Sequence, residues 1–103
     1  MKACIFQPPY SRDLAHSDSF FLQKLEWLDA CDSSLDLIVL PEYSDVPCAT
    51  ATLEETLFYH RKYIDVLLHK CQSTAKRCGA ILCVNALSNE GGYRNTTYVY
   101  SRE

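Results

Sequence analysis

Residues 35–43 read Leu35-Asp36-Leu37-Ile38-Val39-Leu40-Pro41-Glu42-Tyr43, an apolar run that stops at a proline and is followed at once by a carboxylate. A short, unbroken apolar run is typical of a strand buried on both faces in the middle of an α/β sheet. Pro41 has no N–H to give to a sheet ladder, so we expect the strand to end there. Glu42 would then lie just past the carboxyl end of a buried strand, where ligands bind in open α/β sheets and where a desolvated carboxylate can act as a base.

The segment before this strand has the pattern of a strand followed by a helix. Residues 3–7 form a short apolar strand, which Pro8-Pro9 should end because proline extends neither ladder nor helix. A helix is predicted over residues 17–32, with Ser17 or Asp18 as its cap. Its apolar side chains recur at helical spacing and indicate a face packed on a sheet: Phe21, Leu25 and Leu28.

A second, longer helix follows a polar loop over residues 43–51. Thr52 and Glu55 have the spacing of a capping box, and Gly79 can end the helix in a left-handed conformation. His60 and His69 are expected at the surface or at an edge. The predicted buried stripe has spacings of three, four and seven: Leu57, Ile64, Leu68, Cys71, Ala75 and Cys78.

The last third of the chain has the pattern of a hairpin. Residues 80–87 form an apolar strand containing Asn85, residues 88–92 a turn, and residues 93–100 a strand of alternating character. The order is therefore strand, helix, strand, helix, strand, strand. We expect an α/β fold in which the first three strands are parallel and the hairpin is antiparallel, a mixed sheet with the helices on one face.

Four of these pieces, in the same order, resemble the nitrilase or carbon–nitrogen hydrolase superfamily. Residues 36–42 are similar to that family's first catalytic-glutamate motif, and an opening strand ends in Gln7. A strand begins at residues 79–81, and the segment 93–100 carries Asn95 as the family's Asn-bearing strand does. The resemblance covers nearly the whole chain. It implies one half of an α-β-β-α sandwich, with Asn95 ordering the site's end of the sheet.

The resemblance also implies an activity. Members of this family hydrolyse non-peptide carbon–nitrogen bonds in small amides, nitriles or carbamoyl compounds through a Glu, a Lys and a Cys, without a metal or an organic cofactor. Glu42 would be the general base, the one catalytic residue that we assign here. The Lys and Cys of the family follow the Asn-bearing strand, so residues 1–103 are expected to be the N-terminal part of a single, larger domain, inactive alone. The full-length enzyme is expected to be a homo-oligomer.

Composition sets further limits. The net charge of −3 is spread over interspersed acidic and basic residues, which does not favour a nucleic-acid or membrane partner. No signal-peptide core follows Met1, so a cytoplasmic location is expected. The six cysteines lack Cys-x-x-Cys or zinc-finger spacing, and most are predicted to be core thiols rather than metal ligands. Cys48 lies on the loop near Glu42, where local spacing places no activating base.

Two other functions stay open from the residues alone. The chain can be a non-catalytic α/β binding or interaction module, complete in itself, which cooperative unfolding of the isolated chain would favour. It can also be a metal or redox protein that uses its thiols, which zinc analysis and thiol titration would decide.

Overall fold

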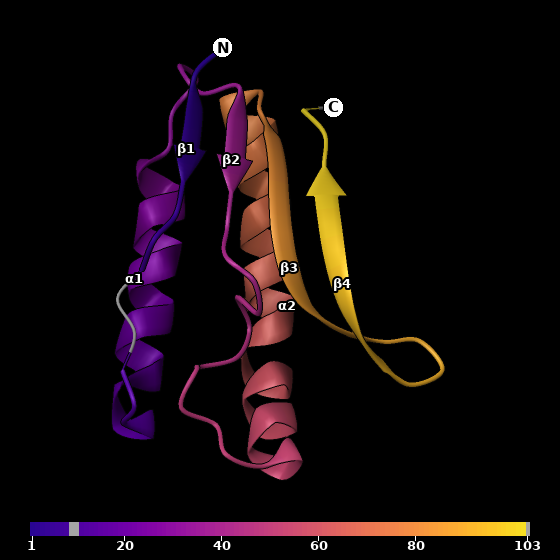
Figure 1. Ribbon diagram of the computed structural model, residues 1–103. Coiled ribbons are helices and arrows are strands. Elements are labelled where there is room, and N and C mark those ends of the chain that lie inside the picture. The colour runs from indigo at the N-terminus through magenta and orange to yellow at the C-terminus, as the bar shows by residue number, and fades with distance from the viewer. Residues whose placement is uncertain (9–10, 103) are drawn as a thin grey trace.

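The computed structural model describes residues 1–8 and 11–102. Pro9 therefore lies outside the described residues, and with it half of the Pro8-Pro9 pair that was predicted to end the first strand. Four strands form one sheet, and two helices lie against one face of it (Figure 1). The strands are β1 (Ala3–Ile5), β2 (Leu37–Val39), β3 (Ile81–Asn89) and β4 (Tyr93–Tyr100). The helices are α1 (Ser17–Ala30), preceded by the 3-10 turn η1 (Leu14–His16), and α2 (Leu53–Cys78).

The sheet is mixed and its strands lie in sequence order, β1-β2-β3-β4. β2 pairs in parallel with β1 on one side and β3 on the other, so that Ile38 lies between Cys4 and Leu82. β3 and β4 pair antiparallel along their whole length, with Val84 opposite Tyr98. The predicted mixed α/β fold is confirmed. β1 ends at Ile5 rather than at residue 7, and β2 has only three residues.

The core lies between the helices and one face of the sheet. Its fully buried side chains include Leu28 of α1, Leu67 of α2 and Ile38, Leu82 and Val84 of the sheet. Side chains alternate along a strand, so their neighbours point to the opposite face. There, Ile5 is 67% exposed and Val99 63% exposed, and Leu37 and Val39 are only half-buried. The expectation that β2 is buried on both faces is wrong for the described residues, because helices cover only one face.

The start of α1 differs from the predicted cap. Asp13 caps the turn η1, its Oδ1 accepting a hydrogen bond from the amide of Ala15 at 2.9 Å. The turn runs directly into α1, so His16 occupies the N-cap position and makes no side-chain capping bond. Ser17 is buried inside the helix and donates to the carbonyl of Leu14 at 2.7 Å. The prediction of Ser17 or Asp18 as cap is therefore wrong, since the preceding turn begins the helical path earlier.

Both ends of α2 are as predicted. The amide of Glu55 donates to Oγ1 of Thr52 at 3.1 Å, and Gly79 ends the helix with φ +66°. Its buried face agrees only in the second half, at Cys71, Ala75 and Cys78. In the first half, His60, Tyr63 and Leu67 are buried, whereas the predicted positions are half-buried: Leu57, Ile64 and Leu68. Tyr63 turns inward because its ring stacks on Phe21 of α1, with centroids 4.1 Å apart.

Candidate functional site

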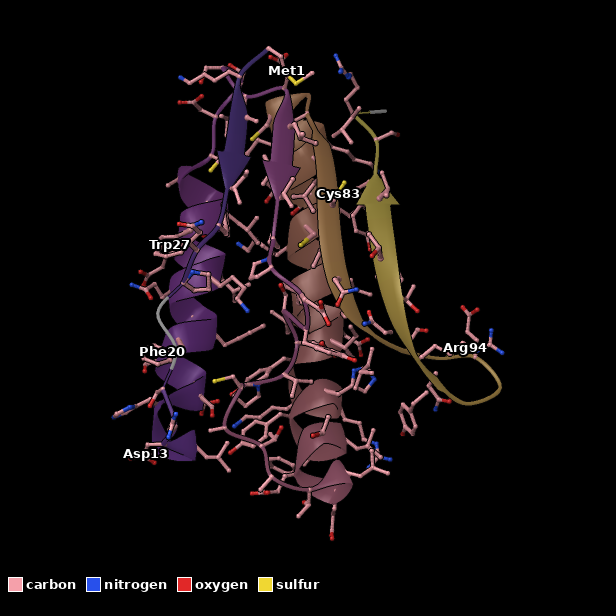
Figure 2. All side chains as sticks on the ribbon, viewed as in Figure 1. Met1, Asp13, Phe20, Trp27, Cys83 and Arg94 are labelled. Carbon is pink, nitrogen blue, oxygen red and sulfur yellow. The ribbon has the colours of Figure 1, made fainter. Side chains whose placement is uncertain are left out.

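A cavity of about 550 Å³ lies where α1, the loop after β2 and the first half of α2 meet. In Figure 1 this loop runs from the lower end of β2 between the two helices. Figure 2 labels two of the wall residues, Asp13 and Phe20, near the beginning of α1. The wall combines apolar and aromatic side chains with a few polar groups, among them Lys24, Glu42 and Asp45. A mainly apolar pocket with convergent polar groups is the usual form of a small-molecule site.

Glu42 forms part of this wall, directly after β2. The amide of Leu40 still donates to the carbonyl of Cys83 at 2.9 Å, and Pro41 then ends the pairing. Glu42 therefore lies at the carboxyl end of the parallel strands, at the edge of the sheet where the sequence predicted it. Its side chain is exposed, however, whereas a desolvated carboxylate was expected. The difference arises because the described elements cover the helix side of this edge and leave its other side open.

The residue after Glu42 has an unusual backbone conformation. Tyr43 has φ +52°, the one left-handed residue other than glycine in the described chain. Its amide donates to Oδ1 of Asn85 on β3 at 2.8 Å, and the amide of Ser44 donates to the carbonyl of Asn85, also at 2.8 Å. A left-handed conformation costs a bulky residue about 1–2 kcal/mol and persists only where its surroundings hold it. Asn85 thus fixes the direction in which the chain leaves Glu42.

Asn95 is connected to the backbone of Tyr43 through Asn85. The side-chain amide of Asn85 donates to Oδ1 of Asn95 and, at 3.3 Å, to Oγ1 of Thr97, both on β4. Because an amide that donates to β4 must turn its oxygen the other way, these contacts orient the acceptor that Tyr43 uses. Asn95 is therefore linked through Asn85 to the amide of Tyr43, the residue that follows Glu42.

A buried acid and a buried histidine anchor the next part of the loop. Asp45 is fully buried, and its Oδ2 lies 2.5 Å from Nδ1 of His60 on α2. The amide of Leu87 on β3 also donates to this carboxylate, at 3.3 Å. The prediction that His60 lies at the surface is wrong, because Asp45 gives its ring a partner inside the protein. A buried polar group is stable only when it is paired in this way.

Lys24 of α1 also contacts the loop after β2. Its Nζ donates to the carbonyl of Ser44 at 2.7 Å. Burial lowers the pKa of this amine to about 8, although the nearby carboxylate of Asp45 acts in the opposite direction. The cavity wall thus contains an amine whose pKa is lowered to about 8, at a position for which the sequence predicted no role.

The six cysteines are free thiols in the part of the chain that the structure describes. Cys48 is exposed, and its Sγ donates to the carbonyl of Ser11 at 3.6 Å. Burial raises the pKa of Cys31 to about 11 and that of Cys71 to about 12, which makes both poor nucleophiles. Over residues 1–8 and 11–102, no group of His, Cys, Asp and Glu side chains has the geometry of a metal site. No helix in this part of the chain is long and apolar enough to cross a membrane.

Comparison with known proteins adds no relative: no protein-family model and no curated protein matches this chain. The nitrilase resemblance therefore rests on the motifs themselves, residues 36–42 and 93–100 above all.

Three contributors to this site escaped the sequence analysis: Lys24, Asp45 and Asn85. The sequence carries a signal for two of the contacts, that of Lys24 with Ser44 and that of His60 with Asp45. Ser17, Phe21, Lys24, Leu28 and Cys31 are spaced 4-3-4-3, which places Lys24 on the buried face of α1. His60 likewise continues the spacing of Tyr63, Leu67 and Cys71 on α2. A charged or polar residue inside a helical apolar stripe indicates a buried partner elsewhere in the chain.

Proposed function

We propose that this chain is the N-terminal part of a nitrilase-superfamily hydrolase, which cleaves non-peptide carbon–nitrogen bonds in small amides, nitriles or carbamoyl compounds. Glu42 serves as its general base. The observation that carries this proposal is the position of Glu42, at the carboxyl end of the parallel strands and in the wall of a cavity of about 550 Å³. The motif over residues 36–42 that resembles the family's catalytic-glutamate segment ends at this residue.

In this mechanism Glu42 acts on two protons. It first takes the proton of a cysteine thiol, whose sulfur attacks the amide carbon, and it passes that proton to the substrate nitrogen; the carbon–nitrogen bond breaks, ammonia or an amine leaves, and a thioester remains. Glu42 next takes a proton from the water that attacks the thioester and returns it to the cysteine sulfur as the carboxylic acid leaves. The nucleophile, and the lysine that stabilises the developing charge, come from outside these elements. The contacts of Asn85 with Tyr43 and Ser44 suit this role, because a base must be held within hydrogen-bonding reach of the proton that it removes.

The open face of the sheet supports the finer fold assignment, half of an α-β-β-α sandwich. This face carries Ile5, Leu37, Val39, Ile81 and Val99, which are exposed or half-buried. Apolar sheet faces are normally covered, and a second sheet packs about 10 Å away in such sandwiches. The second sheet would also cover the open side of Glu42 and remove water from it, the condition under which a carboxylate becomes a useful base.

The test begins with the DNA that follows codon 103. A reading frame that continues into a lysine segment and then a cysteine after a buried strand supports the proposal. Glu42→Gln in that full-length protein should lower amide or nitrile hydrolysis by at least about 100-fold. Glu26→Gln, an exposed residue of α1, is the matched control and should leave the rate unchanged. Unchanged hydrolysis in Glu42→Gln would contradict the proposed base. The isolated chain should be inactive.

A second candidate, a non-catalytic α/β binding module, is favoured by a different observation. The described residues alone already enclose a buried core and wall the cavity. In that case the isolated chain unfolds in one cooperative transition, and a small molecule bound in the cavity raises its Tm. Glu42→Gln would then change ligand affinity without affecting any turnover.

A further inference from the structure

We propose that Lys24 is a covalent binding site for small aromatic carbonyl compounds, which enter the cavity and form a Schiff base with its side-chain nitrogen. This inference does not depend on the proposed hydrolase, because it uses a different residue and a different reaction.

The amine of Lys24 is held at one position in the cavity wall. Lys24 lies on the buried face of α1 and lines the cavity, and the carbonyl of Ser44 holds its Nζ at 2.7 Å. The amine is thus at a fixed point of the wall, whereas a lysine at the surface samples many positions. A nucleophile fixed next to a bound reactant gains rate because less freedom is lost on reaction.

The cavity wall around Lys24 is mainly aromatic and aliphatic. Phe20, Phe21 and Tyr63 contribute aromatic rings, and Leu57 and Leu87 contribute aliphatic side chains. The rings of Phe21 and Tyr63 stack on each other, which keeps this part of the wall in place. A planar aromatic ring on the carbonyl compound finds apolar and aromatic surface here, as ligands do in apolar pockets.

The charge state of Lys24 also favours the reaction. Only the neutral amine is a nucleophile, and desolvation in an apolar pocket is a recognised way to make a lysine reactive. With a pKa of about 8 in place of the ordinary 10.5, Lys24 is neutral in an appreciable fraction of molecules at pH 7. The neutral fraction exceeds that of an ordinary lysine by more than about 100-fold.

The other lysines lie in different surroundings. Lys62 and Lys70 form ion pairs with Asp18 and Asp29 on the outer surface of the two helices, at 2.9 and 2.7 Å. Lys2 donates to the hydroxyl of Ser34, and Lys76 is exposed. The reactivity of Lys24 can therefore be compared with that of exposed lysines in the same protein.

The reaction needs no further reactant. The nitrogen of neutral Lys24 attacks the carbonyl carbon, the carbonyl π electrons move to oxygen, and a proton passes from nitrogen to that oxygen through water. The resulting carbinolamine loses water, and a carbon–nitrogen double bond remains. No group is oxidised or reduced, and hydrolysis reverses the reaction.

The test uses the whole chain with benzaldehyde and sodium cyanoborohydride at pH 7, followed by peptide mapping of every lysine. We expect Lys24 to be benzylated at least ~10-fold faster than Lys76, a lower ratio than the neutral fractions give, because a less basic amine is also a weaker nucleophile. Formaldehyde in place of benzaldehyde should give a smaller preference for Lys24, since it gains nothing from the aromatic wall. Lys24→Arg, which keeps a charge and a donor for Ser44, should abolish the preferential labelling, and Lys76→Arg should not.

Two results would overturn the proposal. Labelling of Lys24 no faster than that of Lys76 would show that the amine is a structural tether for the loop. Equal preference with both aldehydes would show a reactive amine without a binding site for aromatic rings. The map of the unsubstituted chain decides both points even where Lys24→Arg fails to fold.

Discussion

Asp45 illustrates how strongly one buried residue can hold a loop. Its carboxylate is fully buried and contacts both His60 and the amide of Leu87. Asp45→Ala leaves both partners unpaired inside the protein, so we expect the free energy of unfolding to fall by about 3–5 kcal/mol. Urea denaturation measures this. Asp29→Ala, which breaks the surface pair with Lys70, is the control and should cost about 0–1 kcal/mol. Equal costs for the two substitutions would contradict the buried anchor.

Lys24 predicts a pH dependence of stability. Its pKa is lowered from 10.5 to about 8 in the folded chain, so between these values the unfolded state binds more protons than the folded state. Stability should therefore rise with pH in this window, by up to about 3 kcal/mol from Lys24. From about pH 8 upward, Cys31 and Cys71 oppose the rise, because burial raises the pKa of each thiol. Lys24→Met isolates the effect: the difference in unfolding free energy between the unsubstituted chain and this variant should shift in favour of the unsubstituted chain between pH 8 and 9.

Of the residues around the cavity, the sequence located only Glu42, whose position follows from its immediate neighbours in the chain. Glu42 could be located because a strand, a proline and a carboxylate follow one another within a few residues. Asp45 and Asn85 could not, because the contacts that join the loop to α2 and β3 span 15 to 42 residues and depend on how these elements pack. The exposure of Glu42 was also beyond local reasoning, since it depends on what covers the edge of the sheet.

Among the elements, α2 offers a clean test of helix ending. Gly79 has φ +66°, and a Cβ there would meet no atom within 4 Å, so the penalty of a side chain is conformational only. We expect Gly79→Ala to lower the free energy of unfolding by about 1 kcal/mol, measured by thermal or urea denaturation. Gly79→Asn should cost less, because Asn tolerates the left-handed region better. A larger loss with Asn than with Ala would contradict this explanation.

The same helix shows where element prediction succeeds and where it stops. Thr52, Glu55 and Gly79 mark its ends with local chemistry, and these ends were predicted correctly. The face of its first half was not, because Leu57 and Ile64 are apolar but Tyr63 and His60 have the better partners, Phe21 and Asp45. Apolar periodicity identifies a buried face only when the partners across the interface are apolar as well.

At the level of the whole molecule, the mixed sheet with helices on one face followed from the order of the elements, since crossovers by helices make strands parallel and a short turn makes them antiparallel. The sequence did not show that the other face is open. An apolar run such as residues 37–40 has the same pattern whether its second face is covered by the same chain, by another chain or by nothing. Burial on both faces was therefore an inference about a partner layer that the described residues do not contain.

The open sheet face predicts how the isolated chain behaves in solution. Ile5 and Val99 are among its most exposed apolar side chains, and contiguous apolar surface favours association. We expect concentration-dependent self-association in sedimentation velocity, reduced by the double substitution Ile5→Thr and Val99→Thr. Val66→Thr, on the outer surface of α2, is the control and should leave association unchanged. A chain that stays monomeric at high concentration would show that this face is tolerated in water.

The backbone of Tyr43 also has a consequence for the order in which the chain is made. Its left-handed conformation is held by Asn85, which is synthesised 42 residues later. At about 5–20 residues per second, roughly 2–8 s separate the two on a ribosome. Throughout that interval the nascent loop lacks its anchor and relaxes toward ordinary backbone angles. The backbone that follows Glu42 therefore reaches its final conformation only after β3 has been made, long after Glu42 itself has emerged.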